Sequence, residues 1–408
     1  MATATFRRGV AAANRSERFS PFALLRQVDV ALAASAVALA AIGVVMVYSA
    51  TRVQLAHAGE DPHSYLKRQL LWMAIGIVVM VAVTAVDYRI LRHYGYVIYG
   101  LVLLALLGVF VVGTSQYGSV RWYSLGPLQL QPSEFATIGL IIAVATYCSR
   151  KRGVLELRET IGLLLLAVIP MALVFKQPDL GTTIVLGVTL AAMLVTAGIR
   201  VRYLLLLFAV VIGGFVLALH AHVLKPYQMQ RLTGFLHPSQ GLSTYNYDGT
   251  QAKIAIASGR FSGTGLFKGP ATNLAYIPNQ QNDFIFSAVG EQLGFLGSAV
   301  VIGLFGFMAL RMLRAAQTAR DGFGRMICAG ALAFLAFSVF ENIGMTVGIM
   351  PITGIPLPFI SYGGSASFAF FATVGLVLNV ELRRGGKRAS YAIAASTARA
   401  APTAVHRR

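Results

Sequence analysis

Ten apolar segments, each close to the length of a helix that crosses a lipid bilayer, follow one another from near the start of the chain to near its end. Apolar residues make up 56% of the 408 residues, and the segments are spaced too evenly to leave room for a separate soluble domain. We therefore predict an all-α integral membrane protein with about ten transmembrane helices in one bundle. The predicted spans are residues 29–49, 69–86, 96–113, 133–149, 160–176, 180–198, 203–221, 284–310, 326–350 and 364–381.

The distribution of Lys and Arg predicts which side of the membrane each connection occupies. With ten spans both chain ends lie on one side, and the segments on that side hold 24 of the 34 Lys and Arg residues. Because cytosolic segments carry an excess of positive charge, both termini are predicted to be cytosolic. The net charge of +19 is scattered between apolar segments and forms no single basic face, which argues against nucleic acid as a partner.

The polar segments define the domain organisation. Residues 1–28 are predicted to be a basic cytosolic tail, and residues 383–408 a disordered basic tail whose charges suit anionic membrane lipid. Residues 29–382 form the single transmembrane domain. Within it, residues 222–283 make a large extracytoplasmic loop between the seventh and eighth spans, and loops of this length are usually functional or mobile.

Several function classes lack their sequence signatures. Cys148 and Cys328 lie near predicted cytosolic helix ends, so we expect no disulfide. The histidines show no metal-binding spacing, and the chain has no phosphate-binding loop, dinucleotide fingerprint or nucleophile elbow. We therefore predict no metal-ligating residues and no tightly defined cofactor site, and the few carboxylates carry most of the information.

A row of polar residues opens the eighth span. Asp283, Ser287 and Glu291 recur four residues apart, which predicts that they share one helical face. A carboxylate at Glu291, about two turns into the span, needs a partner or water, so the row indicates a wet cavity that opens outward. A helix cap is the alternative role for Asp283, since aspartate favours that position, and Asn282 could fill it instead.

The connection between the third and fourth spans offers four candidate residues. Arg121 is its only cation, and a guanidinium suits bidentate binding of phosphate or carboxylate; a solvated loop arginine is the alternative. Gln131, Ser133 and Glu134 follow in the same outer stretch. An ordinary helix start, with Pro132 in its first turn, explains the last two equally well.

Two further outer connections carry polar residues. Asp179 in KQPDLGTT is typical of a tight turn and helix cap, which competes with a catalytic or binding role. Ser361 precedes two glycines in FISYGG, and these permit close approach of the backbone to a ligand or a neighbouring helix. Glu341 lies near the middle of the ninth span, where an ionisable residue indicates function unless a buried hydrogen bond accounts for it.

Four stretches, in this order, resemble the SEDS family (shape, elongation, division and sporulation) of bacterial cell-wall synthesis. They are RWYSLGPLQLQPSEFA, QPDLGTT, NDFIFSAVGEQLGFLG and NIGMTVGIMPITGIPLPFISYGGS. The resemblance covers nearly all of the predicted spans. Within the family, GIPLPFISYGGS is more similar to the rod-shape branch, RodA, than to the division branch, FtsW.

The resemblance implies a peptidoglycan glycosyltransferase that polymerises lipid II at the outer face of the bacterial plasma membrane, in complex with a class B penicillin-binding protein. It matches the essential aspartate of the family to Asp283, which would act as the general base. The leaving diphosphate needs positive charge, from Arg or Lys or from a divalent cation such as Mg²⁺ or Mn²⁺. The expected substrate-binding residues are the outer polar residues Arg121, Gln131, Ser133, Glu134, Asp179, Glu291 and Ser361.

The chain departs from the family pattern at several outer positions. Thr137 and Thr264 stand where lysine is common, and Asn279, Gln281 and Asn282 replace the usual Glu, His and Thr. These changes affect how the substrate is held more than the role of Asp283.

Two other function classes also fit a ten-span bundle. A transporter or flippase for a lipid-linked precursor would place polar residues within the membrane, and a scaffold would only hold a partner synthase. The outward clustering of polar motifs favours an outer-face enzyme over alternating access.

Overall fold

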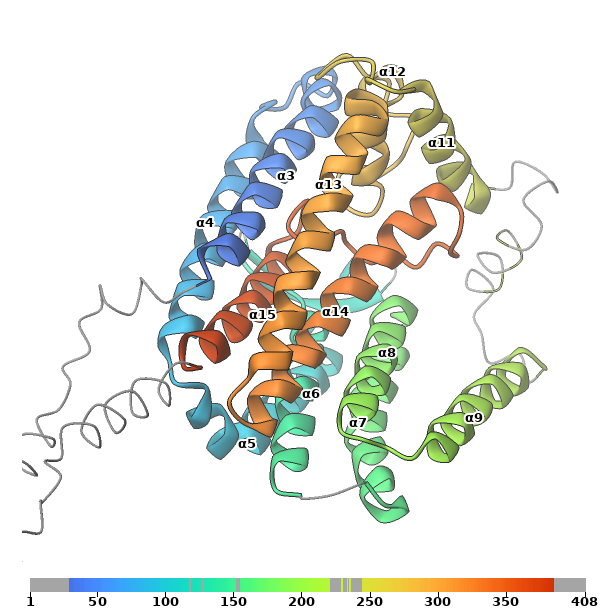
Figure 1. The fold of residues 1–408 in the computed structure, drawn as a ribbon. Helices are drawn as coiled ribbons and strands as arrows, with labels where there is room; N and C mark the ends of the chain where they lie inside the picture. The colour runs from blue at the N-terminus through green and yellow to red at the C-terminus, as the bar shows by residue number, and fades with distance from the viewer. Residues whose placement is uncertain are drawn as a thin grey trace, which may run out of the picture.

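The computed structural model describes residues 29–384, except for 117–118, 127, 152–154 and most of 221–243. Within these residues, ten apolar helices make up the fold, and two shorter helices, α11 (Thr244–Ser258) and α12 (Pro270–Asn273), lie over one end of it (Figure 1). The apolar helices are α3 (Val30–His57), α4 (Ser64–Ala85), α5 (Tyr88–Val112), α6 (Pro132–Ser149), α7 (Leu157–Lys176), α8 (Leu180–Thr196), α9 (Val201–His220), α13 (Ile285–Thr318), α14 (Gly322–Val347) and α15 (Gly364–Leu382).

Each predicted span coincides with one of these helices, and the predicted class of an all-α membrane protein is confirmed. In the part of the chain that the structure describes, eight helices are long and apolar enough to cross a membrane, while α8 and the apolar part of α9 are shorter. Some predicted boundaries are wrong by up to about two turns. The first span ends at residue 49 in the prediction, but α3 continues to His57, because the helix extends past its apolar stretch into polar residues.

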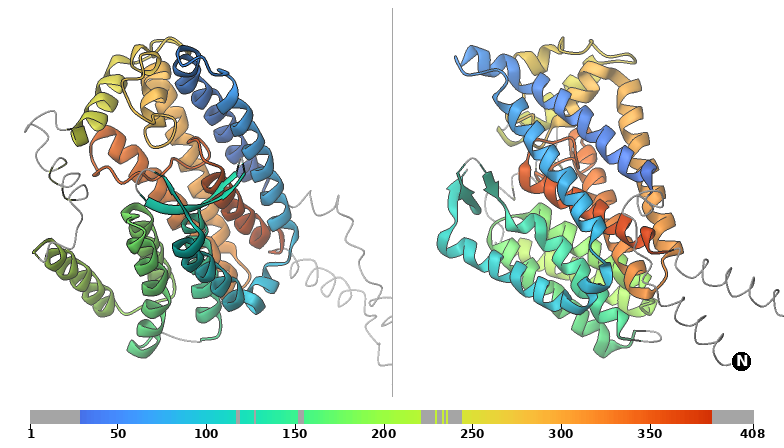
Figure 2. Two further views of the ribbon diagram at one scale, coloured as in Figure 1. Left: turned by 180° about the vertical axis from the view of Figure 1, so that it is seen from behind. Right: turned by 90° about the vertical axis from the view of Figure 1, so that its left-hand side faces the viewer.

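The connection between α5 and α6, predicted as a loop, contains a small antiparallel sheet. Strands β1 (Thr114–Gln116), β2 (Ser119–Leu125) and β3 (Leu128–Leu130) pair in the order β1-β2-β3. β2 contains Val, Trp and Tyr, residue types that favour strands. In the right view of Figure 2, the sheet lies at the edge of the molecule away from α13. Arg121 is therefore held on a strand.

Small residues allow the helices of the bundle to approach closely. α15 is the most buried of the eight long helices and packs against α4, α14, α6 and α3. A Cβ added to Gly375 of α15 would lie 2.7 Å from the Met80 carbonyl oxygen of α4. A Cβ added to Gly43 of α3 would lie 2.6 Å from Ile360 Cα in the loop before α15, so α3 packs equally closely against that loop. Within a membrane, such close packing takes over from hydrophobic association in holding helices together.

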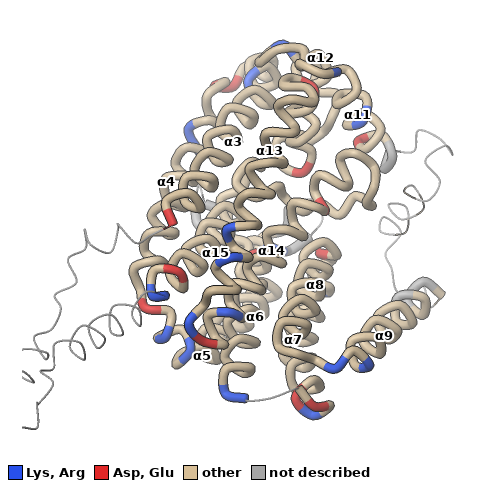
Figure 3. The backbone as a smooth tube through the Cα atoms, viewed as in Figure 1, with Lys and Arg blue, Asp and Glu red and all other residues tan. Residues whose placement is uncertain are grey.

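Both ends of the described chain lie at the same end of the bundle. Arg311, near the end of α13, forms a 2.6 Å ion pair with Asp29, the N-cap residue of α3. Arg384 donates a hydrogen bond to Thr318 Oγ1 at 2.9 Å. Figure 3 shows Lys and Arg positions clustered at this end. Placement of the termini on one side agrees with the predicted even number of spans, and the cytosolic assignment of that side stays a prediction.

The predicted tails, residues 1–28 and nearly all of 383–408, lie outside the described residues, as does most of the first part of the predicted loop 222–283. The described part of that loop contains α11, which packs against α13 and α14, and α12, which packs against α3.

Candidate active site

Asp283 lies in a turn before α13 and not within the helix. α13 begins at Ile285 and its N-cap residue is Phe284, so the helix-cap role considered for Asp283, or for Asn282, is wrong. Asp283 is half-buried and packs against the loop between α14 and α15: a Cβ on Gly354 would lie only 3.3 Å from Asp283 Oδ2. The carboxylate therefore lies where two non-helical segments meet.

The loop between α14 and α15, residues 348–363, contacts both the Asp283 turn and the start of α8. α14 ends at Val347, and its C-cap residue Gly348 adopts a left-handed conformation with φ of 86°. The Tyr362 N–H donates to the Gln281 carbonyl at 2.9 Å, which fixes the loop to the turn before α13. At the start of α8, a Cβ on Gly181 would lie 2.7 Å from Ile355 Cγ1, so α8 abuts the same loop.

Ser361 serves the conformation of this loop. Its Oγ accepts a hydrogen bond from the Leu357 N–H at 2.8 Å, and its carbonyl accepts one from Gln69 Nε2 at 3.3 Å. Gln69 is fully buried in α4 and was not predicted from the sequence. Next to it, the Tyr362 ring packs between Tyr65 and Trp72, with ring centroids 4.6 Å apart in both pairs.

Arg121 attaches the sheet to the turn between α7 and α8. Its Nε donates to the Gln177 carbonyl at 2.6 Å and its Nη2 to the Pro178 carbonyl at 2.5 Å, while Nη1 lies 3.8 Å from Asp179 Oδ2. Asp179 in turn caps α8, because its Oδ1 accepts from the Thr182 N–H at 3.1 Å. The solvated-loop alternative for Arg121 is therefore wrong, and the cap role proposed for Asp179 is confirmed.

Gln131 connects this group to the start of α6 and to α15. Its Nε2 donates to the buried Ser133 Oγ at 2.9 Å and to Asp179 Oδ2 at 3.4 Å. Its backbone N–H donates to Ser365 Oγ at 2.9 Å. Glu134 lies beside these residues in the first turn of α6 and is half-buried. The structure thus brings four predicted residues into one network, and Ser365 is a member that the sequence analysis missed.

Glu291 lies apart from that network and is fully buried. Its Oε1 accepts from the Ala271 N–H at 2.6 Å, and its Oε2 accepts from the Thr272 N–H at 3.1 Å and from the Thr272 hydroxyl at 2.5 Å. Ser287 is also fully buried, and it donates to the Phe284 carbonyl at 2.7 Å. The predicted wet cavity along this face is wrong, because α11 and α12 cover α13 and α12 supplies the polar partners of Glu291.

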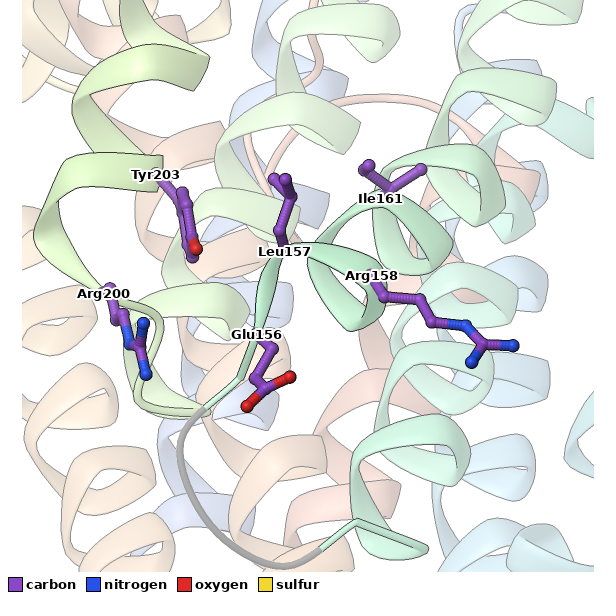
Figure 4. Close-up of a pocket in the computed structure, with 6 residues that line it drawn as sticks. All are labelled: Glu156, Leu157, Arg158, Ile161, Arg200 and Tyr203. Carbon is purple, nitrogen blue, oxygen red and sulfur yellow. The ribbon is translucent and has the colours of Figure 1, made fainter.

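A surface pocket of ≈ 570 Å³ lies elsewhere, between the start of α7 and the start of α9 (Figure 4). It contains none of the predicted site residues and is lined by Glu156, Leu157, Arg158, Ile161, Arg200 and Tyr203. In the described part of the chain, no three His, Cys, Asp or Glu residues are grouped so that they could hold a metal ion. Cys148 and Cys328 are free thiols.

Sequence comparison places the chain among bacterial cell cycle proteins. The FtsW/RodA/SpoVE family profile, described as cell cycle protein, matches residues 30–385. The probable peptidoglycan glycosyltransferase FtsW of Trichlorobacter lovleyi is 35% identical over 360 residues, which cover 87% of this chain and 93% of that protein. The peptidoglycan glycosyltransferase MrdB of Escherichia coli K12 is 33% identical over 83% of this chain and 91% of its own. Stage V sporulation protein E of Bacillus subtilis is 33% identical over 86% of this chain and 96% of its own.

Solved structures show the same fold. The rod shape determining protein RodA of Thermus thermophilus matches with a TM-score of 0.66 and 29% identity, over 88% of this chain and 97% of that one. A chain of a peptidoglycan synthase complex, whose structure concerns coordination of polymerization and crosslinking, matches with a TM-score of 0.71 and 29% identity. The match covers 88% of this chain and 98% of that chain. The identities to the FtsW, MrdB and SpoVE proteins are too similar to separate the branches, so the rod-shape assignment stays a prediction. Because the family profile matches most of its length, the chain belongs to the FtsW/RodA/SpoVE family of cell cycle proteins, the SEDS family.

Proposed function

We propose that this protein is a peptidoglycan glycosyltransferase of the bacterial plasma membrane, which polymerises lipid II into β-1,4-linked glycan strands on the outer face. The observation that carries the proposal is the position of Asp283, a half-buried carboxylate in a non-helical turn, packed against Gly354. Relatives named peptidoglycan glycosyltransferase, at 35% and 33% identity over more than four fifths of the chain, support the reaction class.

In the proposed reaction, Asp283 is the general base. Its carboxylate takes the proton from the 4-hydroxyl of the acceptor sugar while that oxygen attacks the anomeric carbon of the donor. The new glycosidic bond forms as the bond from the anomeric carbon to the lipid diphosphate breaks, and undecaprenyl diphosphate leaves with the electron pair. Attack from the face opposite the leaving group inverts the anomeric carbon and gives the β linkage.

The network of Arg121, Gln131, Ser133 and Asp179, together with the adjacent Glu134, is the proposed substrate-binding region. It adjoins the Asp283 turn through the contact of Gly181 with Ile355. The backbone contacts of Arg121 hold its guanidinium rigidly, and a rigid cation stabilises charge that develops on a leaving diphosphate without reorganising. A divalent cation, Mg²⁺ or Mn²⁺, is an alternative source of that charge.

Ser361 and Glu291 complete the proposed binding residues, and both would act indirectly. Ser361 shapes loop 348–363, whose Tyr362 is bonded to the Asp283 turn. Glu291 accepts hydrogen bonds from α12 and thereby holds α12 against α13. We therefore assign both residues to the shape of the site.

The proposed partner is a class B penicillin-binding protein that cross-links the strands. Support comes from the fold match to a chain in a peptidoglycan synthase complex. The proposed cellular role is wall synthesis during elongation, as in the rod-shape branch, with division or sporulation as the other family roles.

One experiment separates the enzyme from the transporter and the scaffold. The purified protein and its cognate class B partner are placed in liposomes, and polymerisation of labelled lipid II is measured together with its movement across the bilayer. We expect wild type to make glycan and Asp283→Ala to make none while it still binds the partner. A transporter would lose lipid II crossing in Asp283→Ala with polymerisation intact, and a scaffold would show no effect of the substitution.

A further inference from the structure

Asn342 of α14 bonds directly to the backbone of Asp283. Asn342 is fully buried, and its Nδ2 donates to the Asp283 carbonyl and to the Ile355 carbonyl, both at 2.8 Å. A side-chain amide has two N–H groups, so it can make both bonds at once. One side chain thus ties the turn before α13 to loop 348–363.

Glu341, the preceding residue of α14, holds the same loop at a second point. It is 1% exposed, and its Oε1 accepts a hydrogen bond from the Thr353 hydroxyl at 2.7 Å. Thr353 and Ile355 flank Gly354, which has φ of +79° and faces the Asp283 carboxylate. Two adjacent residues of one helix therefore fix both neighbours of the glycine on which Asp283 packs.

We infer that Glu341 and Asn342 are positioning residues, which fix the Asp283 carboxylate against Gly354 by holding Thr353, Ile355 and the Asp283 backbone. The inference rests on the proposed function, because it assigns these residues to the geometry of the proposed base. The inference also assigns a role to Glu341, and a role is expected because an ionisable residue inside a membrane span is costly to bury.

Two physical arguments support a role in catalysis beyond general folding. Loss of the Asn342 amide removes the donor that the Asp283 and Ile355 carbonyls share, at the point where the Asp283 turn and the loop meet, so the two segments are held less firmly there. A general base must stay within hydrogen-bond reach of its proton, and a displacement of about 1 Å can reduce the rate by roughly a hundredfold.

Asn379 provides a matched control at the other end of the bundle. Like Asn342 it is fully buried in a helix, and its Nδ2 bridges two backbone carbonyls, those of Val83 and Val86. Asn379→Asp therefore makes the same chemical change as Asn342→Asp, because each variant loses the N–H donors that bind two backbone carbonyls. Asn379 lies close to Arg383 and away from Asp283.

The test measures lipid II polymerisation by the full-length protein with its class B partner. We expect Asn342→Asp to lower kcat by roughly tenfold to a hundredfold with KM within about twofold of wild type, since substrate binding is kept while the base is misplaced. Asn379→Asp is expected to lower kcat by less than about threefold. Equal kcat for wild type and Asn342→Asp, or equal losses in the two variants, would overturn the inference.

A second pair of variants decides the question if Asn342→Asp does not fold. Thr353→Val removes the hydroxyl that binds Glu341 at nearly constant volume, whereas Thr353→Ser keeps it. We expect a loss of kcat in Thr353→Val and recovery to at least about half of wild type in Thr353→Ser, at unchanged KM. Similar kcat in the two variants contradicts the positioning role.

Wild type and Asp283→Asn, run beside these variants, separate the two proposals. If wild type polymerises lipid II, Asp283→Asn does not, and Asn342→Asp and Thr353→Val both match wild type, the positioning inference fails alone. If wild type makes no glycan, the proposed function fails and the inference fails with it.

Discussion

Thr272 donates its hydroxyl hydrogen to Glu291 Oε2 at 2.5 Å, which joins α12 to the buried face of α13. The same carboxylate accepts the N–H groups of Ala271 and Thr272, two donors in the first turn of α12 that have no partner within the helix. A carboxylate inside an apolar helix is thus satisfied by a covering segment of the predicted outer loop.

Glu291→Gln is expected to destabilise the protein. The amide nitrogen of Gln cannot accept a hydrogen bond, so at least one buried N–H loses its partner, at a cost of about 1–3 kcal/mol in the free energy of unfolding. Thermal unfolding in detergent measures this loss, with Thr272→Ser, which keeps the hydroxyl, as the control. An unchanged Tm together with a raised KM for lipid II would instead assign Glu291 to direct substrate contact.

Arg121→Lys is expected to loosen the sheet from the turn between α7 and α8. A lysine has one nitrogen and cannot reproduce the fork that reaches both the Gln177 and Pro178 carbonyls. We expect faster proteolysis within residues 114–130 than in wild type, with Arg158→Lys at the other end of α7 as the matched control. Identical digestion of wild type and Arg121→Lys would contradict the role assigned to these contacts.

Gly43→Ala is expected to disrupt the contact between α3 and loop 348–363. A Cβ at this position would lie 2.6 Å from both Ile360 Cα and the Phe359 carbonyl oxygen, so the backbones must separate. Gly303→Ala in α13 is the control, because nothing lies within 4 Å of its Cβ position and alanine favours a helix. We expect Tm to fall in Gly43→Ala and to stay level or rise in Gly303→Ala; equal Tm values would show that α3 and loop 348–363 do not pack as described.

Cysteine accessibility tests the predicted topology. In a chain whose Cys148 and Cys328 are replaced by Ala, Lys253→Cys on α11 is expected to react with a membrane-impermeant maleimide on intact spheroplasts. Arg158→Cys on α7 is expected to react only after permeabilisation. The reverse pattern would place the termini outside and would contradict the orientation predicted from the Lys and Arg distribution.

The sequence predicts the helices well because a bilayer imposes one dominant constraint, a run of about 20 apolar residues per span. It predicts the outer connections less well. The contacts of Arg121 with the Gln177 and Pro178 carbonyls and the burial of Glu291 under α12 depend on contacts between segments that are separated in the chain. No periodicity within one segment reports such contacts.

The same limit explains which site residues were missed. Gln69, Asn342 and Ser365 are polar residues in or beside apolar helices, and each donates to or accepts from the backbone of an outer connection. Their signal in the sequence is the presence of a polar side chain in a span, which also marks ordinary helix packing. Asp283, in contrast, stands out because the chain has only 15 carboxylates.

The most direct test compares two carboxylates that the predicted topology places on the outer side, Asp283 and Asp61, in lipid II polymerisation with the class B partner. Asp61 is the control, because a hydrogen bond from Lys67 lowers the pKa of Asp61 to about 2, and its carboxylate is charged at neutral pH. We expect Asp283→Asn to polymerise at least roughly a hundredfold more slowly than wild type and Asp61→Asn to stay close to wild type. Equal rates for Asp283→Asn and Asp61→Asn would contradict the assignment of Asp283 as the general base.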